Sequence, residues 1–293
     1  MDEGRGRGGG TGAVALVLAL LLFGAEEWLQ KGIAALKAGN VVEARAALEE
    51  AVKLAPGEPV MWLAVADARL RSGEAGLAVV AMEQAGMLAP GSPMVERGRG
   101  MFARRMGEVG QGLLDARQEK RAEAVLQVAV KAFPKEAELW RLLGLALYAQ
   151  GRNAAAVAAF VAAIDLAPEE ESLYAGLETL LPAGKAVEAR LAKYVAGHAS
   201  SALGWYLLGL ERGEAALWEK AWALDAKFWP AAFALHKRAE PGRAVQLLER
   251  VVELNPEYAP AYYALAQLYA KQGAREKASA ARKRHHELVA VTP

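Results

Sequence analysis

A repeat of 34 residues constrains the fold of this chain more than any other feature of its sequence. The segment "WLQKGIAALKAGNVVEARAALEEAVKLAPGEP" from Trp28 aligns without a gap with "WLAVADARLRSGEAGLAVVAMEQAGMLAPGSP" from Trp62. A further copy starts at Leu139, and a last copy starts at Tyr262. Because self-similarity at a fixed period is the signature of a repeat architecture, we expect the chain to fold as a stack of similar units.

Each copy has the pattern of two helices. In the copy from Leu139, apolar residues recur at helical spacing from Trp140 to Tyr148, and Gly151 then ends the first helix. A second apolar series ends at Pro168. The same turn and the same stop recur in other copies at Gly39, Gly73 and Gly273, and at Pro56, Pro90, Pro134 and Pro256. One such pair cannot bury its apolar faces alone, so we predict an all-α chain whose stacked helix pairs form a superhelical α-solenoid.

This pattern resembles the tetratricopeptide repeat (TPR) family. Trp28, Trp62 and Trp140 stand at the place of the family's tryptophan, and Tyr262 stands there in the last copy. Small residues follow one turn later and recur in the second helix, at Gly32, Ala66, Gly110, Gly144 and Ala266, and at Ala44, Ala78, Ala122, Ala156 and Ala278. The resemblance implies a non-catalytic scaffold that binds a protein or peptide on a concave surface lined by the first helix of each pair.

Four sections are expected along the chain. Regular repeats occupy residues 26–170, with an insertion at 93–102 before a copy that begins near Ala103. Residues 171–258 form shortened helix pairs, because Pro182 falls where a first helix should end. Residues 259–293 form the last repeat and a charged capping helix.

Residues 1–25 form the first section and have the pattern of a targeting segment. Arg5 and Arg7 lie in a glycine-rich lead, and an uncharged run follows from Thr11 to Ala25. As a helix this run would cover about 22 Å, short of the roughly 30 Å hydrocarbon core of a membrane. A basic lead and a short apolar run are typical of a secretory signal, so we expect export to the periplasm or cell exterior, or a short membrane anchor. The alternative is a first helix with an apolar lead.

Composition excludes several kinds of chemistry. The chain has no cysteine, which rules out disulfides, thiolate catalysis and zinc–cysteine sites. The net charge of +1 gives no global field to attract nucleic acid. Of the four histidines only His285 and His286 are neighbours, and adjacent residues point to different sides of a helix. We therefore expect no catalytic residue, metal site, cofactor, nucleic-acid partner or small-molecule ligand.

The resemblance also places candidate groove residues on the first helices. They are Leu29, Ile33, Leu63, Asp67, Arg141, Leu145, Tyr148, Tyr206, Tyr263 and Gln267, and the third copy adds Arg104, Glu108 and Gln111. An apolar groove of this kind suits a peptide with aliphatic anchors, in a role such as assembly at the cell envelope. The alternative is that the leucines pack against the N-terminal segment or against neighbouring helices.

An aromatic cluster at residues 205–233 supports a second function. The stretch "WEKAWALDAKFWP" from Trp218 to Pro230 could hold a carbohydrate or another small ligand, as a binding protein or an accessory enzyme subunit. In the repeat frame, however, Trp218 falls at the large apolar place that Leu48 and Phe160 fill elsewhere. We therefore predict that Trp218 is a core residue, and that Phe228 and Trp229 are better placed to meet a ligand.

Overall fold

The computed structural model describes residues 9–291, and its side chains are described for residues 21–290. Within that range the chain forms sixteen α-helices and one short 3-10 helix, and no strand. The helices fall into two compact units, Met1–Ala159 and Phe160–Pro293. Each unit is described by itself below, and helix α8 crosses the boundary between them. The predicted all-α solenoid of helix pairs is confirmed.

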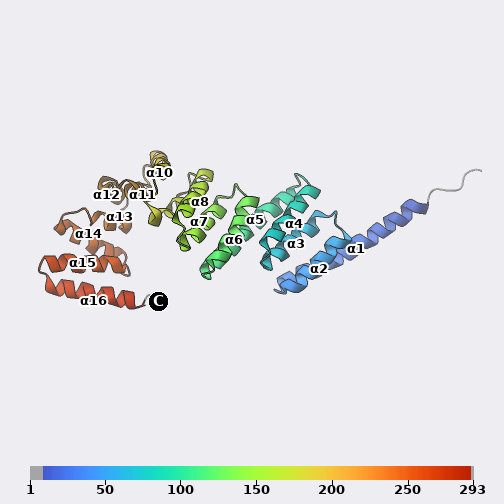
Figure 1. Ribbon diagram of the computed structural model, residues 1–293, viewed down its shortest axis with the longest axis horizontal. Coiled ribbons are helices and arrows are strands. Elements are labelled where there is room, and N and C mark those ends of the chain that lie inside the picture. The colour runs from blue at the N-terminus through green and yellow to red at the C-terminus, as the bar shows by residue number, and fades with distance from the viewer. Residues whose placement is uncertain (1–8, 292–293) are drawn as a thin grey trace, which may run out of the picture. The chain divides into compact units, whose positions relative to one another are not determined.

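The first unit begins with a long helix and continues as consecutive helix pairs, which run from blue to green in Figure 1. Its helices are α1 (Gly9–Lys37), α2 (Val41–Leu54), α3 (Pro59–Arg71), α4 (Ala75–Leu88), α5 (Pro93–Asp115), α6 (Glu119–Ala132), α7 (Ala137–Ala149) and α8 (Asn153–Leu166). Helices α1 and α2, α3 and α4, and α5 and α6 pack as pairs. Each following first helix then packs on the pair before it, since α3 contacts α1 and α2, and α7 contacts α5 and α6.

The second unit contains shorter elements at its start. They are α9 (Glu171–Ala175), η1 (Glu178–Leu180), α10 (Lys185–Gly197), α11 (Ala202–Arg212), α12 (Ala215–Leu224), α13 (Trp229–Leu235), α14 (Pro241–Leu254), α15 (Ala259–Lys271) and α16 (Arg275–Val291). Helices α11 and α12, α13 and α14, and α15 and α16 form its pairs. The five-residue α9 and the seven-residue α13 are much shorter than the thirteen-residue α15, and the ten-residue α12 is shorter than the fourteen-residue α14, so turns are lost from first and second helices alike between 171 and 258.

The turn within six of the described pairs has one recurring geometry, from which the α13–α14 turn departs. A residue just after the first helix has a positive φ, which is +81° at Gly39 and +73° at Gly151. The next backbone N–H then donates to the carbonyl five residues earlier, as from Asn40 to Ala35 and from Arg152 to Leu147. This closure satisfies carbonyls that the helix end would otherwise leave unpaired. The third pair uses Arg117 at φ 55° in the same place, the one described non-glycine residue with a positive φ.

Close contact between the two helices of a pair depends on a missing side chain. A Cβ atom added to Gly110 would lie 2.6 Å from Leu126 Cδ2, and one added to Gly209 would lie 2.5 Å from Trp218 Cδ1. Gly32 lies against Leu48 in the same way. The small residue of the first helix therefore accepts the large apolar side chain of the second helix, and close packing between the two helices follows.

An aromatic side chain ties each of several first helices to the turn before it. The indole N–H of Trp62 donates to the Pro56 carbonyl at 2.9 Å, and that of Trp140 donates to the Pro134 carbonyl at 3.0 Å. In the second unit, the Trp205 indole donates to Ala199 at 2.9 Å and the Tyr174 hydroxyl donates to Pro168 at 2.9 Å. Trp205 and Tyr174 thus hold the tryptophan place of degenerate repeats, which the sequence pattern did not reveal.

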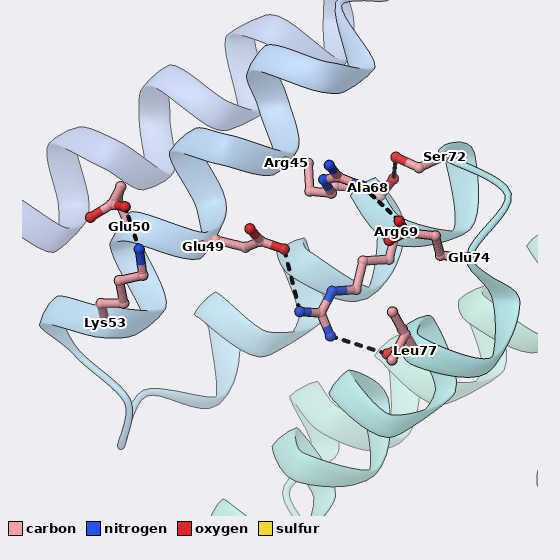
Figure 2. Close-up of polar contacts among 9 residues, drawn as sticks. All are labelled: Arg45, Glu49, Glu50, Lys53, Ala68, Arg69, Ser72, Glu74 and Leu77. Atoms are coloured by element: carbon pink, nitrogen blue, oxygen red, sulfur yellow. Dashed lines mark hydrogen bonds and ion pairs between the residues drawn. The ribbon is translucent and has the colours of Figure 1, made fainter.

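Charged side chains link successive pairs. Figure 2 shows Arg45 and Glu49 of α2 beside Glu74 and Arg69 of the next pair. Arg45 Nη1 lies 2.7 Å from Glu74 Oε1, and Arg69 Nη2 lies 3.3 Å from Glu49 Oε1. Equivalent pairs in the second unit join Asp165 to Arg190, Glu188 to Arg212, and Glu219 to Arg243. Since partly exposed ion pairs contribute only about 0–1 kcal/mol each, they set the register of neighbouring pairs more than the stability.

The structure adds detail at two of the predicted boundaries. Residues 93–102, predicted as an insertion before a copy that starts near Ala103, continue into that copy as one helix, because α5 runs without a break from Pro93 to Asp115. The extra residues lengthen the first helix of the third pair. Helix α1 likewise continues through Ala25, the predicted end of the leader, and residues 1–8 lie outside the described part of the chain. Among the residues that the structure describes, no helix is both long and apolar enough to cross a membrane.

The turn at Arg117 predicts a stabilising substitution. A non-glycine residue in the left-handed region costs about 1–2 kcal/mol of stability, and glycine removes this cost. Glycine also raises the entropy of the unfolded chain, which offsets part of the gain. Arg117→Gly should therefore raise the free energy of unfolding by about 0.5–1 kcal/mol in urea denaturation followed by circular dichroism. The reverse control, Gly151→Ala, should lower it by about 1 kcal/mol. An unchanged or lower urea midpoint for Arg117→Gly would contradict this account of the turn.

Candidate functional site

Two adjoining clefts lie along helix α5. The larger, of about 740 Å³, opens between α5 and α7, and the smaller, of about 420 Å³, opens between α3 and α5. Arg104 and Glu108 line both clefts, so the two form one surface, which we call the α5 groove. Its other lining residues include Leu63, Asp67, Gly98, Gly100, Met101, Ala103, Gly107, Gln111, Asp115, Glu136, Glu138, Leu139 and Leu142.

The extension of α5 builds this groove. Gly98 lies against Leu63 of α3, where an added Cβ would be 3.1 Å from Leu63 Cδ2. Gly107 lies against α7, where an added Cβ would be 3.4 Å from Leu139 Cδ2 and 3.5 Å from Leu142 Cδ1. A Cβ at Gly100 would meet nothing within 4 Å, so the backbone there is open to an approaching chain. Gly98, Met101 and Phe102 of the predicted insertion therefore line the smaller cleft, and Gly100 lines the larger one.

The rim of the groove is charged and is richer in acids than in bases. Asp67 lies 3.0 Å from Arg71 and 3.4 Å from Arg105, and this links α3 to α5. Glu138 pairs with Arg141 at 2.5 Å. Arg104 is the exposed cation of the larger cleft, which also carries Glu108, Asp115, Glu136 and Glu138. The groove thus combines this charged rim with apolar lining residues such as Leu63, Met101 and Leu139, and a groove for aliphatic anchors stays a prediction.

The predicted groove residues divide into four groups, one of which is buried. Leu63 and Asp67 line the α5 groove, together with Arg104, Glu108 and Gln111 of the third pair. Tyr263 and Gln267 line a separate cleft between α15 and α16. Ile33, Arg141 and Leu145 are partly buried and Tyr148 is exposed, and none of these four lines the α5 groove.

Two of the predicted residues are placed in the interior. Leu29 is 4% exposed and Tyr206 is 6% exposed, so neither is presented to a partner. The Tyr206 hydroxyl donates to Glu178 at 2.8 Å, and its ring meets Phe228 edge-on at 5.4 Å. Burial, followed by the nearby Glu178 carboxylate, raises the pKa of Tyr206 above its ordinary value. These residues hold the fold together instead of facing a groove.

A second cleft lies between α15 and α16 and has a volume of about 400 Å³. We call it the end groove. It is lined by Tyr263, Ala266, Gln267, Ala270, Lys271, Arg282, His285 and His286. The His285 ring donates through Nδ1 to the Ala259 carbonyl at 3.1 Å and lies 5.4 Å from the Tyr263 ring. No carboxylate is among these lining residues, in contrast to the α5 groove.

The aromatic stretch at 205–233 packs inward. Trp218 is 7% exposed and lies over Gly209, which confirms that it is a core residue. Trp229 packs against Tyr258 with ring centroids 4.5 Å apart and the rings tilted by 46°, and Phe228 packs on Tyr206. Burial raises the pKa of Tyr258 and lowers that of His236. The rings fill the space left by the missing turns, and this arrangement gives no support to a ligand pocket.

The described residues include no cluster of metal-binding side chains. No group of three or more histidine, aspartate or glutamate side chains there is arranged to hold a metal ion. The adjacent His285 and His286 rings are 5.8 Å apart and tilted by 59°. The chemistry that these surfaces offer is therefore charge, hydrogen bonding and shape.

Comparisons with known proteins agree with the helix-pair architecture. Models of the family described as tetratricopeptide repeat match residues 25–68, 110–171 and 235–284, which together span about half of the chain. Among curated proteins, none matches.

Solved structures match at low identity. The C-terminal part of a TPR repeat-containing protein from Cytophaga hutchinsonii is 15% identical, with 90% of this chain and 96% of that chain covered and a TM-score of 0.46. MamA from Desulfovibrio magneticus RS-1 is 24% identical, with coverages of 65% and 96% and a TM-score of 0.32. YrrB, described as a TPR protein with an unusual peptide-binding site, is 13% identical, with coverages of 74% and 96% and a TM-score of 0.39. These identities are too low to transfer a partner or a site residue.

The burial of Trp218 predicts a large loss of stability on truncation. Trp218→Ala should lower the free energy of unfolding by about 3–5 kcal/mol, because a buried indole is replaced by a cavity beside Gly209. Thermal unfolding should show a marked fall in Tm. The half-buried Trp222→Ala in the same helix is the matched control and should cost less. An unchanged Tm for Trp218→Ala would refute a core role.

Proposed function

The chain belongs to the tetratricopeptide repeat family, whose repeats serve as protein-interaction scaffolds, and we propose that it is a non-catalytic member that binds a polypeptide segment in the α5 groove. The observation that carries this proposal is the pair of adjoining clefts that share Arg104 and Glu108. Together they offer an elongated surface with apolar lining residues and a charged rim across three consecutive first helices, α3, α5 and α7. A surface of this form suits an extended or helical segment.

The chemistry of the groove indicates the kind of segment that fits. Gly100 leaves backbone exposed on the floor, so a main chain can approach closely. Three carboxylates of the larger cleft have no partner from another helix among the described ion pairs, and they are Glu108, Asp115 and Glu136. The single cation of that cleft is Arg104. A segment with one or more basic side chains therefore complements the acidic rim, and one with an acidic residue beside Arg104 would also fix its direction.

Site-specific photo-crosslinking tests this proposal. A photoreactive amino acid at position 104 in the groove should capture a polypeptide from the native fraction, whereas the same group at Arg121, an exposed arginine of α6, should not. Glu136→Lys on the rim should weaken capture about tenfold through like-charge repulsion. Glu83→Lys is the charge-matched control, because Glu83 is an exposed residue of α4 that does not line the α5 groove. Equal capture from positions 104 and 121, or equal loss with both charge reversals, would contradict binding in the groove.

We further propose that residues 1–25 deliver the chain to the cell envelope. Support comes from the sequence alone, in the basic lead with Arg5 and Arg7 and the uncharged run from Thr11 to Ala25. Helix α1 includes most of that run and continues into the first repeat. A scaffold delivered in this way would hold its partner at or beyond the membrane.

The mass of the natural N-terminus tests the targeting proposal. Intact-mass spectrometry of the protein from fractionated cells should find a chain shortened near Ala25 in the exported fraction, or a full-length chain in the membrane fraction. Cytoplasmic protein treated in parallel is the control. A full-length chain that starts at Met1 and is confined to the soluble cytoplasmic fraction would contradict the proposal while leaving the α5 groove untouched.

A further inference from the structure

The end groove occupies the place where another first helix would pack if the second unit continued. In the first unit, Leu63 contacts the next first helix at Gly98, and Gly107 contacts the next one at Leu139 and Leu142. Tyr263 holds the same place in the last pair, one residue after the position of the repeat tryptophan, and is 55% exposed. Among the described residues no further helix covers this surface of α15 and α16, and Lys271 and Arg282 are exposed there.

The residues that line this surface differ from those at the same places in the inner pairs. Arg282 replaces the buried leucines at Leu48 and Leu126, and His285 replaces the buried alanines at Ala51 and Ala129. Those inner residues are packed in the core, whereas Arg282 is exposed and His285 is partly exposed. A site shaped for a helix is therefore lined here with cationic and hydrogen-bonding groups.

The positive charge of the end groove has no counterion among the described residues. Lys271 and Arg282 both line it, and neither takes part in an ion pair there. Other cations of α16 are already paired, with Lys277 3.8 Å from Glu249 and Arg284 3.3 Å from Glu287. Solvation of a capping helix would explain scattered charge, but it does not require a cleft that is lined by two unpaired cations and no carboxylate. Charge complementarity points to a carboxylate-bearing occupant.

We propose that the end groove binds an acidic helical segment of a partner protein. The groove provides the shape, because its equivalents in the inner pairs receive a helix, and Lys271 and Arg282 provide the charge. Carboxylates four residues apart lie on one face of a helix, so a single helix can offer both cations a partner. Gln267 and Tyr263 add neutral hydrogen-bonding groups at the rim. This surface is distinct from the α5 groove and opposite in charge, so the inference stands without the proposed function of that groove.

Binding of a defined probe peptide to the full chain tests the inference. The probe is a fluorescent alanine-based helix of about 17 residues with glutamate at every fourth position, and the comparison peptide carries glutamine instead. Anisotropy at low salt should give a Kd about tenfold lower for the glutamate peptide. The double variant Lys271→Gln/Arg282→Gln should weaken binding about tenfold. The double variant Arg275→Gln/Lys283→Gln removes the same charge from α16 outside the groove and should change Kd by less than about twofold.

Several results would overturn the inference. Equal weakening by the two double variants would show diffuse attraction to the basic helix, and equal affinity for the two peptides would exclude carboxylate recognition. Displacement of the probe by single-stranded RNA or by vesicles of anionic lipid at equal charge concentration would assign the surface to another class of ligand. Self-association that is measured by sedimentation and abolished by Lys271→Gln/Arg282→Gln would identify the occupant as a second copy of the chain.

Discussion

The fold depends on one kind of contact, in which a large apolar side chain from the second helix of a pair lies over a glycine or alanine of the first. At Gly110 the space that a Cβ would need is filled by Leu126, and at Gly209 it is filled by the indole of Trp218. This contact sets the distance between the two helices, and that distance fixes where the turn and the next first helix can lie. A larger residue at the small position would separate the helices and remove the packing on which each pair depends.

The contacts between pairs are weaker and more varied than those within a pair. Aromatic donors reach back to the carbonyl of the preceding turn, and partly exposed ion pairs join neighbouring second helices to the next pair. Where the repeat is shortened, a carboxylate that accepts backbone hydrogen bonds joins neighbouring helices instead. The Glu211 carboxylate of α11 accepts hydrogen bonds from Ala183 N at 2.6 Å and Gly184 N at 2.7 Å, and so caps the start of α10. The interactions between pairs thus change with local sequence while the interaction within a pair is kept.

The sequence predicted what depends on spacing and missed what depends on neighbours. Glycine at the turn and alanine in the second helix recur at fixed intervals, so the helix pairs and the burial of Trp218 could be read from the pattern. The interior positions of Leu29 and Tyr206 could not, because the exposure of a side chain depends on what packs against it in three dimensions. The role of Trp205 could not be predicted, because Ala199 stands where the repeat pattern has proline. The Ala199 carbonyl that accepts the indole hydrogen bond therefore had no signal in the sequence. The helical character of residues 93–102 was masked by Gly98 and Gly100, which are poor helix formers.

The same position in the repeat can serve packing or recognition, depending on whether a helix packs against it. Leucine at the place of Arg282 would leave an apolar face exposed among the described residues, and such a face invites aggregation. Charge at that place keeps the face solvated, and cations without a counterion among the described residues supply the charge that the proposed acidic helix would meet. The α5 groove arises in another way, from clefts on both sides of a lengthened first helix within the stack. Charged residues at packing positions and a lengthened first helix are both departures from the repeat, and the end groove and the α5 groove lie at these departures.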